Sequence, residues 1–482
     1  MHLRAITLSG LLLAGAAPSV LAEEAPAATA TPATNLSGEV PERKMWNLAA
    51  GGFLQADAVV VDQSSQDQLS PAGSEPLNTQ RFLVRRAHVF VEAHRNALAG
   101  VIEMDANTVR GMAVGLARAE VALGRVRPGW DAELGLGLLR IPFGLEVQEW
   151  DPDRYFLERS NVSRALFPGT FDLGARGKAS WRFVRAQFAV TNGNPLGDAS
   201  FPARDPNAAK DFVGRLGVDA TVAGKVHVSA GFSSLKGTGV HPGTPAAKDV
   251  LVWRDNNEDG IVQLSEIQVI AGRAATPSQN FSRFAVGADS RIGATLPRLG
   301  RLMLFGEVVW GANLDRALLP VDPVASGRDL REFGWVVGAS QEFTRWAALG
   351  VRYDFYNPDL DGFRQTPMAI ASRGMSFRTW TFTLSWGGMG RDRLLLEYQH
   401  NHSALAVAAD GAPTTMAANT LTLRGQVVCQ CDAGGSASIC PCFLPPVVAL
   451  PATPVWRRAC AWPEASSIAA PSTSWTARAF PP

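Results

Sequence analysis

Two segments of alternating apolar and polar residues decide the fold: DAELGLGLLRIPFG at residues 131–144 and FDLGARGKASWRF at residues 171–183. Such alternation is typical of β-strands, whose side chains point in turn to opposite faces. The charged and aromatic segment 145–170 between them is too long for a turn, whereas residues 184–190 follow the second segment at once. Long loops at one edge of a sheet and tight turns at the other indicate a transmembrane β-barrel.

The composition agrees with this class of fold. The chain has 482 residues, of which 46% are hydrophobic, and its formal net charge is +1. After the N-terminus it contains no run of eighteen apolar residues, which a transmembrane helix would need. We expect no nucleic-acid partner, because a nearly neutral chain creates no field that would attract one.

The first 44 residues are expected to lie outside the barrel. Residues 1–22 combine a basic start, an apolar run and a small residue, Ala22, before two glutamates, which is typical of a secretory signal peptide. A retained anchor helix is the alternative, although the apolar run is short for one. Residues 23–44 are rich in Ala, Pro and Thr, which indicates a flexible linker.

The alternation recurs along the chain and predicts an all-β antiparallel barrel within residues 45–429, in the outer membrane of a Gram-negative bacterium. The sixteen expected strands cover residues 49–62, 81–94, 97–106, 113–124, 131–143, 171–183, 184–193, 211–221, 225–236, 283–295, 300–312, 332–343, 347–357, 375–387, 392–401 and 418–429. An even number of strands places both ends on the periplasmic side. The connections alternate between short and mostly long, which fits periplasmic turns and outer loops.

Polar and apolar residues separate onto two faces of these strands. In the segment 347–357, Leu349 and Val351 alternate with Arg352, and in the segment 81–94 the phase places Leu83 with the apolar residues. Apolar side chains on the outward face and polar side chains on the inward face predict that lipid surrounds the barrel and that water fills it. Four outward tryptophans are candidates for interfacial aromatic girdles, with ordinary core packing as the alternative: Trp310, Trp335, Trp380 and Trp386.

Several short motifs resemble those of the phosphate-selective porins O and P. They are RRA at residues 85–87, LLRIPFGLE at 138–146, LER at 157–159, FDLG at 171–174 and TNG at 191–193. The resemblance covers about residues 49–428. It implies a homotrimeric, sixteen-stranded channel for small anions, and a third outer loop, here about 145–170, that folds into the barrel as its constriction.

Arginine would give such a channel a preference for anions, because its planar guanidinium can hold an oxyanion with two hydrogen bonds. By strand phase or by position in the expected constriction loop, seven arginines are candidates for the pore lining: Arg86, Arg140, Arg154, Arg159, Arg164, Arg352 and Arg424. The loop also contains Glu149, Asp151, Asp153 and Glu158. The alternative is therefore that the arginines pair with carboxylates and leave a weakly selective pore.

The long outer connection 237–282 contains the twelve-residue calcium-binding pattern, DNNEDGIVQLSE at residues 255–266. The positions that supply oxygen ligands to Ca²⁺ in this pattern are Asp255, Asn257, Asp259, Ile261 through its carbonyl, Gln263 and Glu266. We expect calcium to order this loop without gating the pore. An acidic, solvated loop is the alternative, because the preceding residues 250–253 look extended rather than helical.

All five cysteines lie at or after residue 429. Cys429 occupies the outward position at the end of the last strand, where the barrel assembly machinery usually reads an aromatic residue. Residues 430–482 show no alternation and many prolines. We expect this tail to be either out-of-register sequence from a frameshift or a genuine extension whose cysteines bind zinc or form disulfides.

Together these features predict an outer-membrane porin that passes small hydrophilic solutes by diffusion and prefers anions such as phosphate. The rivals are a weakly selective porin, and a calcium-stabilised surface or adhesion protein that uses the barrel as an anchor. An outer-membrane enzyme is not expected, because the histidines are scattered and no nucleophile-elbow motif is present.

Overall fold

The computed structural model describes residues 46–61, 80–109, 112–127, 129–197, 204–222, 225–366, 369–372, 374–387, 392–404 and 419–432. The expected signal peptide, the linker and the tail beyond residue 432 lie outside the described residues. The last strand continues through residues 430–432, which the sequence had placed in the tail.

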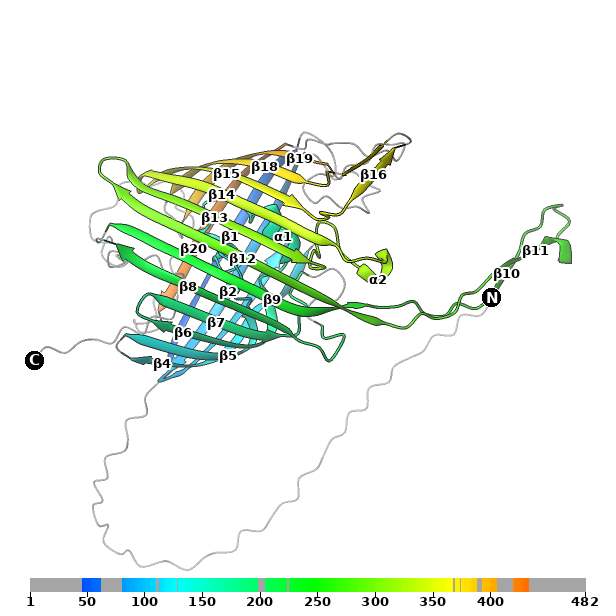
Figure 1. The fold of residues 1–482 in the computed structure, drawn as a ribbon, viewed down its shortest axis with the longest axis horizontal. Coiled ribbons are helices and arrows are strands. Elements are labelled where there is room, and N and C mark those ends of the chain that lie inside the picture. The colour runs from blue at the N-terminus through cyan, green and yellow to red at the C-terminus, as the bar shows by residue number, and fades with distance from the viewer. Residues whose placement is uncertain are drawn as a thin grey trace, which may run out of the picture. The chain divides into compact units, whose positions relative to one another are not determined.

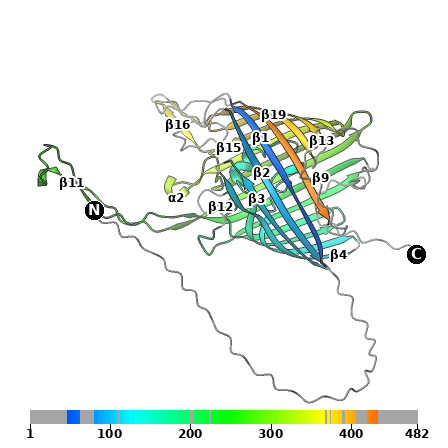
Figure 2. The ribbon, with the colours of Figure 1, turned by 180° about the vertical axis from the view of Figure 1, so that it is seen from behind.

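Sixteen antiparallel strands form one closed barrel, as the sequence predicted (Figure 1). They are β1 (Asn47–Val61), β2 (Gln80–Arg95), β3 (Leu98–Asn107), β4 (Ala113–Arg127), β5 (Trp130–Arg140), β6 (Phe171–Trp181), β7 (Val184–Thr191), β8 (Asp211–Val222), β9 (Val226–His241), β12 (Gln279–Leu296), β13 (Gly300–Ala312), β14 (Arg331–Thr344), β15 (Ala347–Asn357), β18 (Phe377–Gly387), β19 (Arg393–Ser403) and β20 (Thr420–Asp432). Figure 2 shows the closure, where β1 (blue) lies beside β20 (orange). Closure removes every free edge, so the backbone hydrogen bonds are satisfied within the sheet.

Four short strands lie in two of the long connections; the sequence indicated an extended conformation for residues 250–253 and did not predict the other three. β10 (Val250–Trp253) pairs with β11 (Ile267–Ile270), and β16 (Phe363–Thr366) pairs with β17 (Ala369–Ser372). A strand of four residues places only two side chains on each face, so its alternation cannot be recognised in the sequence. The described part of the chain contains no helix that is both long and apolar enough to cross a membrane.

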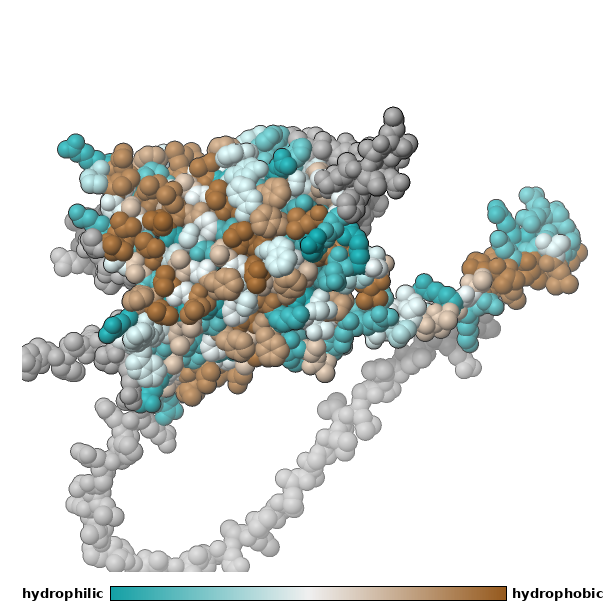
Figure 3. All heavy atoms as spheres, viewed as in Figure 1, coloured by the Kyte–Doolittle hydropathy of each residue, from teal (hydrophilic) through white to brown (hydrophobic). Residues whose placement is uncertain are grey.

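The outer wall is apolar and the inner wall is polar. Leu349 and Val351 of β15 are 49% and 37% exposed, whereas the next residue, Arg352, points inward and is 3% exposed. Figure 3 shows hydrophobic residues (brown) spread over this outer wall. The predicted separation of faces is therefore present, with water-facing groups inside and lipid-facing groups outside.

One predicted face was wrong. Gln55 pairs with Arg86 and Ala56 pairs with Val84, so Arg85 is an extra residue that has no partner across the ladder. Such a β-bulge reverses the alternation beyond it. Leu83 consequently faces inward and is 8% exposed, against the expectation that it faces the lipid.

Aromatic side chains form two groups on the outward face, one near each end of the strands. The group near the long loops includes Phe188, Phe212, Phe284, Trp310, Trp335, Tyr353 and Trp380, and the group near the short turns includes Trp130, Trp181, Phe183, Trp346 and Trp386. The ring centroids of Trp335 and Phe355 lie 6.3 Å apart in a stacked arrangement, and those of Trp380 and Tyr353 lie 4.7 Å apart. Two such belts mark the two membrane interfaces.

Candidate functional site: a loop within the barrel lumen

The connection between β5 and β6 turns back into the barrel, in the segment where the sequence placed a constriction loop. It carries a 3₁₀ turn, η1 (Asp151–Asp153), and a short helix, α1 (Asn161–Leu166). Loop groups donate hydrogen bonds to inward side chains of four different strands: Gly144 N–H to Ser233 Oγ (3.0 Å), Leu145 N–H to Glu307 Oε2 (2.9 Å), Leu157 N–H to Glu397 Oε2 (2.8 Å) and Asn161 Nδ2 to Asp354 Oδ1 (2.7 Å). The loop therefore lies against the inner wall.

One side of the loop is apolar and packs on the wall of β8, β9 and β12. Phe143, Val147 and Val162 are at most 1% exposed and share one hydrophobic cluster with wall residues Val213 and Leu235. Burying a side chain of this size stabilises a fold by about 1.5–3 kcal/mol. Packing and hydrogen bonds together fix the loop, so its charged residues have defined positions in the lumen.

Glu158 of the loop joins the loop to the closure of the barrel. Its carboxylate accepts hydrogen bonds from Arg86 (2.8 and 2.9 Å) and from Arg424 (2.8 Å), and Arg85 lies at 3.7 Å. Burial alone would raise the pKa of Glu158, but the three arginines outweigh it and hold the pKa well below its usual value. Arg86 and Arg424, two predicted pore residues, are thus paired with a charged carboxylate.

Arg85 was not among the predicted pore residues. The bulge places it on the same side as Arg86, where its guanidinium donates to Asp57 (3.1 Å). Sequence alternation assigns neighbouring residues to opposite faces, so only the bulge reveals that both arginines point inward.

Four more of the predicted arginines hold the loop together. Arg154 forms an ion pair with Asp151, and Arg352 donates to the carbonyl of Glu158 (2.7 Å). Arg140 donates to the carbonyl of Glu149 (2.5 Å), and Arg159 donates to the carbonyl of Phe167 (2.7 Å). These contacts favour the alternative interpretation, in which the arginines stiffen the channel rather than offer free charge.

Arg164, at the end of α1, is the exception among the seven. Its side chain is half-buried, and within the described part of the chain its guanidinium has neither a hydrogen bond nor an ion pair. Burial lowers the pKa of Arg164, but a guanidinium remains charged at neutral pH. Glu158 and Asp354 attract this charge through space, but no side chain among the described residues bonds to it directly.

Two wall arginines that the sequence did not single out also bind the loop. Arg393 of β19 donates to the carbonyls of Pro152 (2.8 Å) and Arg154 (2.6 Å), and Arg291 of β12 pairs with Glu149 (2.6 Å). Arg393 alternates with the outward Leu394, as expected for an inward residue. The sequence contains no signal for which inward arginine reaches the loop.

The loop covers one part of the inner wall and leaves another accessible. Thr381 and Ser385 of β18 are 0% and 4% exposed, whereas the inward side chains of Arg118 on β4 and Lys178 on β6 are 31% and 34% exposed. Lys178 is paired with Glu133 of β5 (3.0 Å). The accessible charged wall of β4, β5 and β6 is where solutes can contact the protein.

Acidic residues of the loop differ in their pKa values. Burial and the neighbouring carboxylate of Glu149 raise the pKa of Asp153 to about 6. For Asp151, burial would raise the pKa, but Arg154 and Arg86 lower it below its usual value. The charge of the loop therefore changes in the range around pH 6.

The predicted calcium-binding segment is a compact turn between β10 and β11. Asp255 accepts hydrogen bonds from the N–H groups of Asp259 (3.2 Å) and Gly260 (2.8 Å), and Gly260 has a φ of 70°. Glu266 accepts from the indole N–H of Trp253 (3.1 Å), which lowers its pKa. The two ends of the segment are thus held together.

The middle of the segment is also closed by its own hydrogen bonds. Asn257 accepts from Asp259 N–H (3.1 Å), and Asp259 accepts from the N–H of Ile261 (2.7 Å) and from the amide of Gln263 (2.7 Å). Among the described residues, no three His, Cys, Asp or Glu side chains already stand together as a metal site.

No known family model matches the sequence, and no curated protein matches it. The structure is similar to the outer membrane channel DcaP of Acinetobacter baumannii, with 11% identity, 80% of this chain and 97% of that chain covered, and a TM-score of 0.50. Two further similar structures are OprB of Pseudomonas putida (11% identity, 80% and 94% covered, TM-score 0.48) and the trimer form of OmpT of Vibrio cholerae (10% identity, 80% and 99% covered, TM-score 0.44). At these identities the likeness concerns the fold.

The fold and the two faces of its wall define the class of protein. A closed antiparallel barrel with an apolar outer face, a polar inner face and aromatic belts is a transmembrane protein of the outer membrane of Gram-negative bacteria.

Proposed function

We propose that the protein is a porin, through which small hydrophilic solutes diffuse passively, with a modest preference for anions such as phosphate. The observation that carries this proposal is Arg164, whose guanidinium lies without a protein partner among the described residues, on a loop inside the barrel. The selectivity of a pore depends on the charge and hydrogen-bonding groups at its narrowest part. Ion-selective conductance across a planar bilayer tests the proposal.

The preference is expected to be modest because most lumenal charges neutralise one another. Arg176 pairs with Glu120 (2.5 Å), Lys178 pairs with Glu133 (3.0 Å), and Arg424 pairs with Asp57 (2.7 Å). Paired charges attract a passing ion far less than a free one does. The resemblance to the phosphate-selective porins supports an anion preference, and the pairing supports the alternative of a general, weakly selective porin.

We also propose a homotrimer, because one sector of the wall differs from the rest. Among the described residues of β1 to β4, Phe82 is the one outward aromatic side chain, and the others are aliphatic or small. Lipid-facing sectors of such barrels carry aromatic belts, so a sector with a single outward aromatic residue is suited to contact another subunit. A photocrosslinker at Val89 of this sector should trap oligomers, whereas one at Leu216 of β8 should not; both positions are 59% exposed.

The segment 255–266 is proposed to bind Ca²⁺ in an outer loop. The match at every specified position supports it, together with the positive φ of Gly260 at the required turn. The carboxylates of Asp255 and Asp259 accept hydrogen bonds from the loop backbone and still have lone pairs to offer a cation. The ion would order the outer loop. It would not gate the pore, because the segment lies apart from the residues that bind the lumenal loop.

A further inference from the structure

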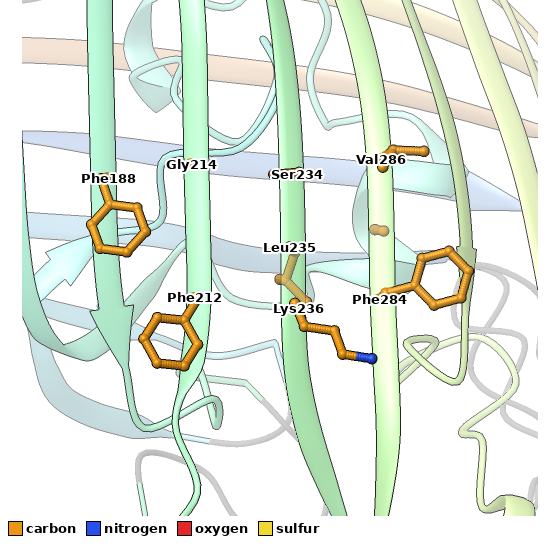
Figure 4. A pocket seen from close by; sticks show the side chains of 9 residues that line it. Phe188, Phe212, Gly214, Ser234, Leu235, Lys236, Phe284 and Val286 are labelled. Carbon is orange, nitrogen blue, oxygen red and sulfur yellow. The ribbon is translucent and has the colours of Figure 1, made fainter.

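The outward wall has a depression between β7, β8, β9 and β12 (Figure 4). It has a volume of about 460 Å³, and the outward residues in its lining include Phe188, Phe212, Gly214, Ser234, Lys236 and Phe284; Leu235 and Ala285, which alternate with them, also border it. Phe188 and Phe212 are 52% and 51% exposed on the outer face, and Val213, next to Phe212 in the chain, is buried on the inner side. The depression therefore faces the membrane and not the lumen.

The register of the strands explains its form. Lys236 is paired directly with Phe212 on one side and with Phe284 on the other. Two residues further along the same face, Ser234 is paired with Gly214. Small residues thus form the floor, aromatic rings form the walls, and an ammonium group stands at one end.

The floor is open at Gly214. A Cβ atom added there would lie 3.8 Å from its nearest neighbours, at ordinary contact distance. A larger side chain at this position can therefore fill the depression without displacing the wall.

The depression lies at the outer end of the barrel. Phe212 is the second residue of β8, which begins after the long outer connection 192–210. Phe284 packs on Trp310 of the outer aromatic belt, with ring centroids 5.0 Å apart. A lysine on the lipid face is strongly disfavoured at the bilayer midplane but is tolerated near the interface. Lys236 donates one hydrogen bond to Ser282 (2.7 Å).

We propose that this depression binds a phosphorylated lipid of the outer leaflet, with an acyl chain between the phenylalanine rings and a phosphate on Lys236. An ammonium group has three donors, and Ser282 takes one, so two remain for phosphate oxygens. The apolar walls suit a hydrocarbon chain, which a free phosphate ion lacks. Charge and apolar surface therefore point to one amphiphilic ligand.

The test is native mass spectrometry of the purified full chain with lipid A that carries both phosphates. Lys236→Ala should weaken binding about tenfold, the loss expected for one charged hydrogen bond, and Lys236→Arg should restore it. Gly214→Leu should weaken binding while the charge is kept. The control is Arg378→Ala at the outer end of β18, where the guanidinium lies over Phe355 (5.8 Å); it should leave binding unchanged.

Three results would overturn the proposal. The first is equal binding of lipid A from which the phosphates have been removed. The second is an equal loss in Arg378→Ala, which would indicate general attraction by cations at the rim. The third is displacement of lipid A from the site by inorganic phosphate, which would mean that the acyl chain contributes nothing.

Discussion

Arg424 of the last strand and Asp57 of the first strand form a bidentate ion pair across the closure of the barrel. The Nε and Nη2 atoms of Arg424 donate to the two carboxylate oxygens of Asp57 at 2.7 and 2.9 Å, and both residues are buried. Arg424 also donates to the carbonyl of Leu157 in the lumenal loop (2.8 Å). A single guanidinium thus connects both ends of the sheet with the loop.

Replacing Asp57 by Ala should destabilise the barrel. The change leaves Arg424 buried with only part of its partners, and breaking one side of a buried pair costs about 3–5 kcal/mol. The remaining bond to Glu158 should limit the loss to the lower end of that range. Urea unfolding in detergent measures it, with Arg331→Ala as the control.

The control removes an exposed pair. Arg331 is half exposed and bonds Asp361, and such pairs contribute about 0–1 kcal/mol. An equal loss of stability in Asp57→Ala and Arg331→Ala would show that the closure pair has no special role.

Replacing Arg164 by Ala should reduce anion preference. The loss of this positive charge, which has no hydrogen bond or ion pair within the described residues, should lower the anion-to-cation permeability ratio by about twofold, because salt screens part of its field. Reversal potentials in a salt gradient measure this ratio. Conservative replacement of Arg164 by Lys should retain most of the preference.

The matched control for this change is Arg118, whose guanidinium is paired with Glu120 (3.1 Å) in the same lumen. Arg118→Ala should change the permeability ratio less than Arg164→Ala does. The opposite order would mean that paired charges, and not the unpaired one, set the selectivity.

The selectivity should depend on pH through Asp153. Its pKa is raised to about 6, so the carboxylate is charged at pH values well above 6 and mostly neutral at pH values well below it. Acidification through this range removes a negative charge from the loop, and the reversal potential should shift towards anions. In Asp153→Asn this shift should be absent, and an unchanged pH response in that variant would assign the effect to another group.

Calcium should protect the outer connection between β9 and β12 from proteases. An affinity on the order of 10⁻⁴–10⁻³ M would suffice outside the cell. Cleavage between Gly237 and Ser282 should fall when calcium is added, and this protection should vanish in the double variant Asp255→Ala, Glu266→Ala. Asp205→Ala, in a different outer connection, is the control, and cleavage that ignores calcium in the unaltered chain would refute the site.

The sequence predicted the barrel well because membrane and water impose opposite demands on the two faces of each strand. Leu394 and Leu396, for example, are 50% and 41% exposed on the outer face, while Glu397 beside them is 1% exposed. The bulge at Arg85 escaped prediction because Leu83 and Val84, beyond it, are both apolar and do not show which of them faces outward, and the face of Leu83 was therefore wrong.

The lumenal site was predictable only in part. Strand phase placed Arg352 and Arg424 on the inner face, and both are there. Their partners depend on the path of the loop, which brings Glu158 to Arg424 from a position 266 residues earlier in the chain. Alternation contains no information about such contacts, so the sequence could not separate the six arginines that are paired from Arg164, which has no such partner among the described residues.

As an open, passive pore, the barrel should conduct ions without any energy source. Single-channel recording of the purified protein in a planar bilayer with a potassium chloride gradient tests it most directly. We predict steady open channels with a reversal potential on the anion-selective side at neutral pH. Absence of conductance would contradict the pore itself, and a reversal potential on the cation-selective side would contradict the assignment of Arg164.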